Sequence, residues 1–154
     1  MPLRVIEGIE ELKRLAGQEI GASDWVEVGQ SVIDAFAETT RDHQWIHVEA
    51  GRARTESPFG TTVAHGFLTL SLLSHLKSQA IQVRGGFKMA INYGLNRVRF
   101  PAPVRAGSRI RGRFTLQAVD DVAGGVQATL LATVEVEGSK KPALVAEWLL
   151  RYYR

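Results

Sequence analysis

The sequence of 154 residues contains no cysteine. A disulfide framework and thiolate catalysis are therefore excluded, and the absence fits a cytoplasmic protein. No apolar run reaches the ~18 residues of a membrane span, and the start of the chain lacks the apolar core of a signal peptide. Internal repeats, linkers and low-complexity segments are also missing. We expect a soluble, cytoplasmic protein with a single domain over residues 1–154 and no membrane partner.

Basic residues exceed acidic ones and give a net charge of +3, but they are not gathered into one patch. Nucleic-acid-binding modules usually cluster basic residues and interleave them with aromatic ones. The densest basic group here, Arg105, Arg109, Arg111 and Arg113, instead follows one face of an alternating strand. We therefore expect no nucleic-acid partner. The mild positive charge suits a small anionic ligand, whose phosphates arginines can pair with.

Short helices are expected in the first third of the chain. Apolar residues recur at helical spacing over 9–16, and a short strand follows at 25–28. A second helix is predicted to begin near Ser31, whose hydroxyl can cap free amides, and to end near Arg41. A further helical turn is predicted over 49–56, because a serine-proline pair follows it.

Residues 65–81 form the most apolar helix-length segment of the chain. Its leucines and phenylalanine surround the helix almost completely, which is typical of a buried helix rather than a surface one. At a rise of ~1.5 Å per residue the segment spans about 24 Å, enough to cross a sheet. We expect this helix to form the centre of the domain.

After residue 86 the apolar residues alternate with a period of two, which predicts strands. The alternating stretches are 87–100, 110–118, 126–136 and 144–152, with turns at 120–125 and 138–142. The parity of the apolar residues slips near Asn96-Arg97, which predicts a β-bulge. Clean alternation with tight turns indicates antiparallel strands covered on one face. The periodicity therefore predicts an α+β domain in which an antiparallel sheet wraps around a long central helix.

Asp42 and His47 form the first candidate for catalytic chemistry. They stand just past the second predicted helix, where the negative end of the helix dipole makes a carboxylate mildly unfavourable. Gly66 begins the apolar helix, where backbone amides have no intrahelical acceptor. An acid, a base and such amides could together polarise a carbonyl group and steer a water molecule.

Two motifs carry a resemblance to a known family. Asp42-x-x-x-x-His47, followed by Phe-Gly-x-x-Val-Ala-His-Gly at residues 59–66, resembles the signature of the MaoC-like (R)-specific enoyl-CoA hydratases, which have the hot-dog fold. The sequence of residues 92–101 is similar to that of the nodulation-protein-N-like dehydratases. The resemblance covers nearly the whole chain. It implies a homodimeric hydro-lyase without a cofactor, acting on enoyl or 3-hydroxyacyl groups carried by coenzyme A or an acyl carrier protein.

The resemblance also implies a role for individual residues. Asp42 and His47 would hold the water, the Gly66 amide would bind the thioester oxygen, and the substrate-binding residues would be Ser74, Trp45 and Phe59. Trp45 stands where many relatives have proline, which puts the pocket shape in question. The remaining histidines are expected to be structural (His65) or at the surface (His43 and His75). No metal is expected, because Asp42, His47 and His65 match no zinc-site spacing.

Each of these residues also has a structural explanation. Asp42 could be a solvated acid, and His47 a half-buried histidine at a strand edge. Gly66 could serve close packing, and Ser74 could bond to its own helix. Two other functions on the same fold stay open: a thioesterase, in which water attacks the carbonyl carbon, and a non-catalytic acyl-binding subunit.

Overall fold

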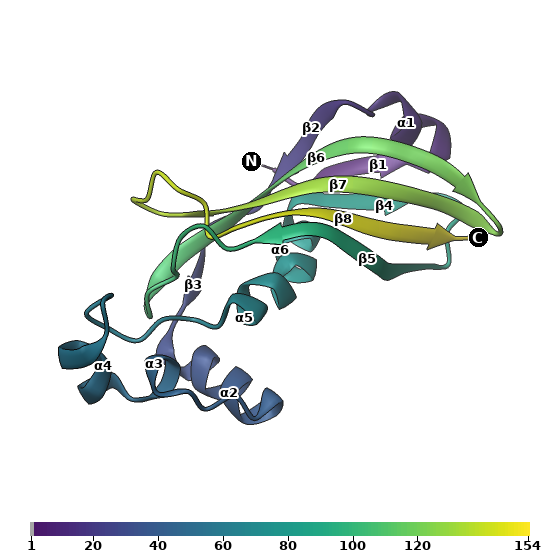
Figure 1. The fold of residues 1–154 in the computed structure, drawn as a ribbon. Coiled ribbons are helices and arrows are strands. Elements are labelled where there is room, and N and C mark those ends of the chain that lie inside the picture. The colour runs from purple at the N-terminus through teal and green to yellow at the C-terminus, as the bar shows by residue number, and fades with distance from the viewer. Residues whose placement is uncertain (1) are drawn as a thin grey trace.

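The computed structural model describes residues 2–154 and consists of a long curved sheet packed over helices (Figure 1). The sheet is antiparallel, with the order β2 (Gln18–Ala22), β6 (Ser108–Val122), β7 (Gly125–Val136), β8 (Leu144–Tyr153) and β5 (Met89–Arg99). A short strand, β3 (Val26–Val28), also pairs with β6. The α+β architecture predicted from the periodicity is therefore confirmed.

The concave face of the sheet is covered by two consecutive helices, α5 (Gly66–Ser71) and α6 (Leu73–Ala80) (Figure 1). A parallel pair, β1 (Arg4–Glu7) with β4 (Ile81–Arg84), and α1 (Gly8–Arg14) close one end of the domain. Three further helices form a separate group below the sheet in Figure 1: α2 (Gln30–Thr40), α3 (Trp45–Val48) and α4 (Ala50–Glu56). We call this group the helical lobe.

The core lies between α6 and the alternating inner residues of β6, β7 and β8. Every second side chain is buried along β7, β8 and the first part of β6, up to Leu116, as the alternation predicted. Gly112 on β6 permits the close approach of α6, because a Cβ atom built there would lie 3.0 Å from Cβ of Leu76. Leu76 and Phe114 are fully buried as a result. The central helix and the sheet therefore form one tightly packed layer pair.

Two predictions about the apolar pattern are wrong. The helix predicted over 65–81 divides at Leu72, and Phe67 at its start is 69% exposed rather than buried. The apolar residues of the stretch from 87 to 95 were expected to face the core, yet Met89 and Tyr93 are each 57% exposed. Both departures have one physical cause, because β5 is the edge strand and α5 projects beyond the sheet toward the helical lobe. The apolar residues of these two segments therefore lie on a surface that the rest of this chain leaves exposed.

Local details follow the sequence in part. The predicted bulge is confirmed, since the pairing of β5 with β8 shifts between Asn96 and Arg99 and Arg97 has a positive φ of 52°. A second shift, between Asn92 and Gly94, was not predicted. The helix α2 begins at Gln30, so Ser31 lies inside the first turn instead of capping it. Sequence analysis also missed β1, β2, β4 and α3. Among the described residues, no helix is long and apolar enough to span a membrane.

Truncating Leu73 to Ala should lower the free energy of unfolding by ~2–5 kcal/mol, because the side chain is only 2% exposed and its loss leaves a cavity. Leu72, at the helix break and only partly buried, is the matched control, and its truncation should cost less. Denaturant unfolding at one fixed protein concentration measures both. A loss below about 1 kcal/mol for both variants would show that α6 is not central to the core.

Candidate active site

Asp42 lies just past the end of α2. The helix stops at Thr40, and Arg41 then adopts the left-handed conformation with φ of 61°, which turns the chain away from the helix axis. Asp42 follows in an exposed loop, as predicted for a helix end. One of its carboxylate oxygens, Oδ1, accepts a hydrogen bond from the amide of Gln44 at 3.3 Å. This local bond fixes the carboxylate in the loop.

His47 lies on α3 and is only 7% exposed. Its Nδ1 atom lies 2.7 Å from the carbonyl oxygen of Val63. Since a carbonyl oxygen can only accept a hydrogen bond, Nδ1 carries the proton and Nε2 presents a lone pair. The strand-like segment of residues 62–64 is itself held on both sides, with the Val63 amide donating to Ile46 and the Ala64 amide donating to Val104. The imidazole is therefore fixed in one tautomer and one orientation.

His65 joins these two residues. It is 3% exposed, and its Nε2 atom lies 3.0 Å from the backbone carbonyl oxygen of Asp42, so Nε2 donates the hydrogen bond. Its ring stacks on that of His47, with the centroids 3.8 Å apart and the planes 21° from parallel. Its Nδ1 atom is buried and has no hydrogen-bond partner among the residues that the structure describes. His65 thus holds the Asp42 loop in place, in line with the structural role expected for it.

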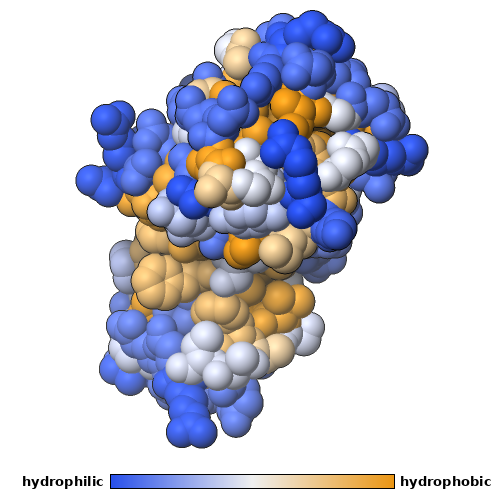
Figure 2. Space-filling model, turned by 90° about the vertical axis from the view of Figure 1, so that its right-hand side faces the viewer, coloured by the Kyte–Doolittle hydropathy of each residue, from blue (hydrophilic) through white to orange (hydrophobic). Residues whose placement is uncertain are grey.

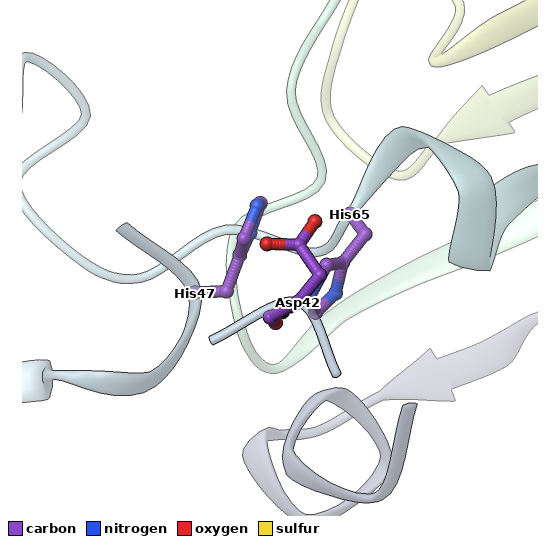
Figure 3. A group of neighbouring side chains, drawn as sticks. All are labelled: Asp42, His47 and His65. Atoms are coloured by element: carbon purple, nitrogen blue, oxygen red, sulfur yellow. Dashed lines mark hydrogen bonds between the residues drawn. The ribbon is translucent and has the colours of Figure 1, made fainter. Parts of the chain in front are cut away.

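The three side chains converge from three different elements (Figure 3). One ligand atom from each of Asp42, His47 and His65 lies within 4.8 Å of those of the other two. A metal ion would have to use His47 Nε2 and His65 Nδ1, because the other ring nitrogens bind carbonyl groups. Each lone pair lies in the plane of its own ring, and the two planes are stacked 21° from parallel, so the two lone pairs are poorly placed to converge on one ion as metal ligands do. The arrangement therefore suits proton transfer better than metal binding.

The electrostatics of the cluster favour a neutral His47. Burial lowers the pKa of His47 below its ordinary value of 6.5, and the neighbouring His65 lowers it further. The bond to Val63 and the charge of Asp42 act in the opposite direction without restoring that value. At neutral pH the imidazole is thus uncharged, and its free Nε2 can accept a proton.

Gly66 is the first residue of α5, directly after His65. Its amide has no acceptor within the helix, as for every first helical residue. The ring of Phe100 lies against Gly66, so that a Cβ atom built there would be 3.2 Å from three ring carbons. The position is therefore compatible with both explanations raised from the sequence. The glycine permits close packing against Phe100, and its amide has no partner within the helix.

Asp42, His47 and Gly66 share one cavity of about 500 Å³, which we call the acid–base cavity. Its other lining residues are Phe36, Thr40, His65, Phe67 and Phe100. Sequence analysis had not assigned Phe36, Thr40, Phe67 or Phe100 to the site. The only signal for Phe100 was its place in the stretch of residues 92–101 that carried the second resemblance.

The other residues expected to bind substrate lie elsewhere. Phe59 lines a neighbouring cavity of about 280 Å³, beyond Gly66 and Phe100, which line both cavities. Ser74 is exposed and lines a further cavity of about 330 Å³ between the helices and β5. Trp45 lines none of these three cavities, because its ring packs on the guanidinium group of Arg52 at 4.3 Å. The doubt that Trp45 raised about pocket shape therefore does not concern the acid–base cavity.

The histidines predicted at the surface are found there. His43 is exposed beside Glu38, with its Nε2 atom 3.6 Å from the carboxylate. His75 is also exposed, on α6. Neither lines the acid–base cavity.

Comparison with known proteins identifies the family. Residues 11–137 match the family described as MaoC like domain. The 3-hydroxyacyl-thioester dehydratase Z of Mycobacterium tuberculosis (strain H37Rv) is 54% identical over 151 residues, which cover 97% of this chain and 99% of that protein. Nodulation protein N of Rhizobium leguminosarum bv. viciae is 50% identical over 134 residues, 86% of this chain and 83% of the relative.

Solved structures agree with the sequence comparison. The (R)-hydratase of A. caviae involved in PHA biosynthesis superposes with a TM-score of 0.70 at 26% identity, over 87% of this chain and 96% of that one. The monoamine oxidase regulatory protein of Archaeoglobus fulgius superposes with a TM-score of 0.77 over 100% of this chain and 99% of that one, and at 21% identity it supports the fold alone. The sheet wrapped around α5 and α6 is the hot-dog fold of these proteins, and the chain belongs to the MaoC-like domain family.

Proposed function

We propose that this protein catalyses the reversible, (R)-specific addition of water to trans-2-enoyl thioesters, with Asp42, His47 and the Gly66 amide as the catalytic groups. The reaction class, that of a hydro-lyase, is the one its relatives are named for: a 3-hydroxyacyl-thioester dehydratase at 54% identity and an (R)-hydratase of the same fold. The substrate would be carried by coenzyme A or an acyl carrier protein. We also propose that the enzyme works in the cytoplasm, which cell fractionation would check.

The proposed mechanism uses the neutral imidazole of His47 as the base. A water molecule held between Asp42 and His47 Nε2 attacks Cβ of the enoyl group and gives one proton to Nε2. Charge moves onto the thioester oxygen, where the Gly66 amide stabilises it. The imidazolium, stabilised by the Asp42 carboxylate, then returns the proton to Cα. One O–H bond and the π bond between Cα and Cβ break while a C–O and a C–H bond form, so the net reaction is the addition of one water molecule.

The observation that carries this proposal is the hydrogen bond from His47 Nδ1 to Val63. It leaves Nε2 as a free base in a cavity that also contains the Asp42 carboxylate and the first amide of α5. An assay with crotonyl-CoA tests the proposal, with chiral analysis of the product. Loss of enoyl absorbance with an (R)-3-hydroxy product supports hydration. Release of free thiol would indicate a thioesterase, and neither change would indicate an acyl-binding subunit.

We further propose a homodimer formed through β5. This edge strand exposes Met89, Ile91, Tyr93 and Leu95, and an exposed apolar edge must be paired or covered. Near the acid–base cavity, Phe67 is 69% and Phe100 41% exposed. On the face shown in Figure 2, apolar side chains gather around the waist between the sheet and the helical lobe. The proposed interface would therefore lie next to Gly66, with one site in each subunit.

Replacing Ile91, which is 44% exposed on β5, by Lys should shift the particle from twice the 17.0 kDa chain mass to the single-chain mass. A lysine there would place a charge in the apolar interface. The matched control is Val32→Lys, on α2, where a similarly apolar side chain is 40% exposed away from β5. Light scattering measures the mass of both. A wild-type protein that is fully active as a 17.0 kDa particle would contradict the homodimer.

A further inference from the structure

A fourth cavity, of about 510 Å³, lies where the end of α6 meets the start of β5. Its apolar walls include Leu3, Val83, Phe87 and Met89, and its polar groups include Lys77 and Tyr152. We call it the lysine cavity. It has no place in the mechanism proposed above, because Lys77 is three helical turns from Gly66.

Lys77 is a cation for which the described part of the chain supplies no counter-ion. Within residues 2–154 it forms no ion pair, and no acidic side chain lines the cavity. Its Nζ atom lies 5.8 Å from the centre of the Tyr152 ring, and the side chain is half-buried. Burial lowers the pKa of Lys77 and raises that of Tyr152 to about 12. An unpaired, partly desolvated ammonium group is costly unless an anion compensates it.

The position of Lys77 relates it to the acid–base cavity. Phe67, Leu70, Ser74 and Lys77 follow one another at spacings of three or four residues, so they share one face of α5 and α6. This face meets the acid–base cavity at Phe67, the cavity containing Ser74 in the middle, and the lysine cavity at Lys77.

The opposite wall of this row of cavities is supplied mainly by one strand. Phe100, just after β5, lines the acid–base cavity, and residues 92–95 of β5 line the cavity that contains Ser74. Met89 and Ala90, at the start of β5, line the lysine cavity. From Gly66 to Lys77 the helices advance by about 16 Å. The cavities therefore form a row along which an extended acyl chain would lead away from the catalytic groups.

We propose that Lys77 binds a carboxylate at the distal end of an apolar chain lying in this row. The inference rests on the proposed function, and it names a substrate class: enoyl thioesters with an acidic group at the far end of the acyl chain. The apolar walls suit methylene groups. Among the described residues, the charged side chains that line the lysine cavity are Lys77 and Lys88, both cationic, so an anion would be compensated there. The same chemistry is offered by a free fatty acid entering with its carboxylate toward Lys77.

The kinetic test compares two series of trans-2-enoyl-CoA substrates of graded length, one ending in a methyl group and one in a carboxylate. In the wild type, one length of the carboxylate series should be used at least as well as its methyl counterpart. Lys77→Met should lower kcat/KM for that substrate about ten-fold or more, since hydrogen bonds to charged groups are of this strength. It should leave the methyl-ended substrate within about three-fold, and Lys77→Arg should retain most of the preference.

The binding test does not depend on turnover. Titration calorimetry with dodecanoate and with dodecanedioate should show binding that weakens in Lys77→Met and persists in Lys77→Arg. If the thioesters are not hydrated but both acids bind through Lys77, the proposed function fails and the carboxylate site stands. Competition of dodecanoate with hydration would identify free fatty acids as a second source of the ligand. Equal losses for methyl-ended and carboxylate-ended substrates, or acid binding unchanged in Lys77→Met, would overturn the inference.

Discussion

Replacing Asp42 by Asn, or His47 by Gln, should lower kcat by about 10²-fold or more while the fold remains intact. Both substitutions keep the size of the side chain and most of its hydrogen bonding. Asp42→Asn removes the charge beside the imidazole, and His47→Gln removes the group that accepts the proton. If either folded variant keeps near-wild-type turnover of crotonyl-CoA, the role assigned to that residue is wrong.

The pH dependence separates the two roles. Because the pKa of His47 is lowered below 6.5, the imidazole is neutral at and above neutral pH, and kcat/KM should fall only on the acid side, with a midpoint below that value. Asp42 raises the pKa of His47, so Asp42→Asn should move the midpoint to still lower pH. A midpoint that stays in place would show that the fall of kcat/KM at low pH does not reflect the protonation of His47.

The double variant of Asp42 and His47 should lose little more kcat than the single variants, since the pair acts as a unit.

The second large effect is expected at Gly66. Replacing it by Pro removes the amide hydrogen, and the loss of one such donor lowers kcat by about 10²–10³-fold. Proline is favoured at the first position of a helix, where its missing N–H breaks no helical bond. The preceding residue, His65, already has the extended conformation that proline requires of its neighbour, with φ of −60° and ψ of 138°. The substitution is therefore compatible with the backbone.

Gly66→Ala is the matched control for that substitution. It adds a Cβ atom that meets the ring of Phe100 at 3.2 Å, as proline also would, but it keeps the amide. The difference in kcat between the two variants isolates the hydrogen-bond donor from the packing. If Gly66→Ala is as slow as Gly66→Pro, close packing against Phe100 explains the glycine and another group must bind the thioester oxygen.

Much of the fold was predictable because its strands are strictly one-sided. In β7, β8 and β6 up to Leu116, a buried and a more exposed residue alternate, so periodicity alone predicted the antiparallel sheet and its turns. The pairing of Asp42 with His47 was also predictable, since the end of α2 and the short α3 bring residues of close sequence position together. Gly66 lines the same cavity because it directly follows His65, whose Nε2 atom bonds to the Asp42 carbonyl group.

The remainder depended on contacts between distant segments. The hydrogen bond from His47 to Val63, which fixes the tautomer, spans 16 positions and has no sequence pattern. Trp45 was expected in the pocket because it stands between the two residues proposed as catalytic, but its ring packs on Arg52 instead. The apolar residues of β5 alternate as core residues do, although this strand lies at the edge of the sheet. In the proposed homodimer a partner would bury them, and such burial would give the same sequence pattern as burial by the strand's own chain.

The attachment of the helical lobe has a consequence for how such enzymes diversify. The lobe contributes Asp42 and His47. The segment that follows it, residues 62–64, bonds to Ile46 of the lobe and, through a short ladder, to residues 104–106 just before β6. The row of cavities, in contrast, belongs to α5, α6 and β5. Recombination between homologues at Gly29 and Ala64 would exchange Asp42 and His47, the proposed acid and base, while leaving the row of cavities intact. The reaction and the choice of acyl chain could therefore evolve along separate stretches of the gene.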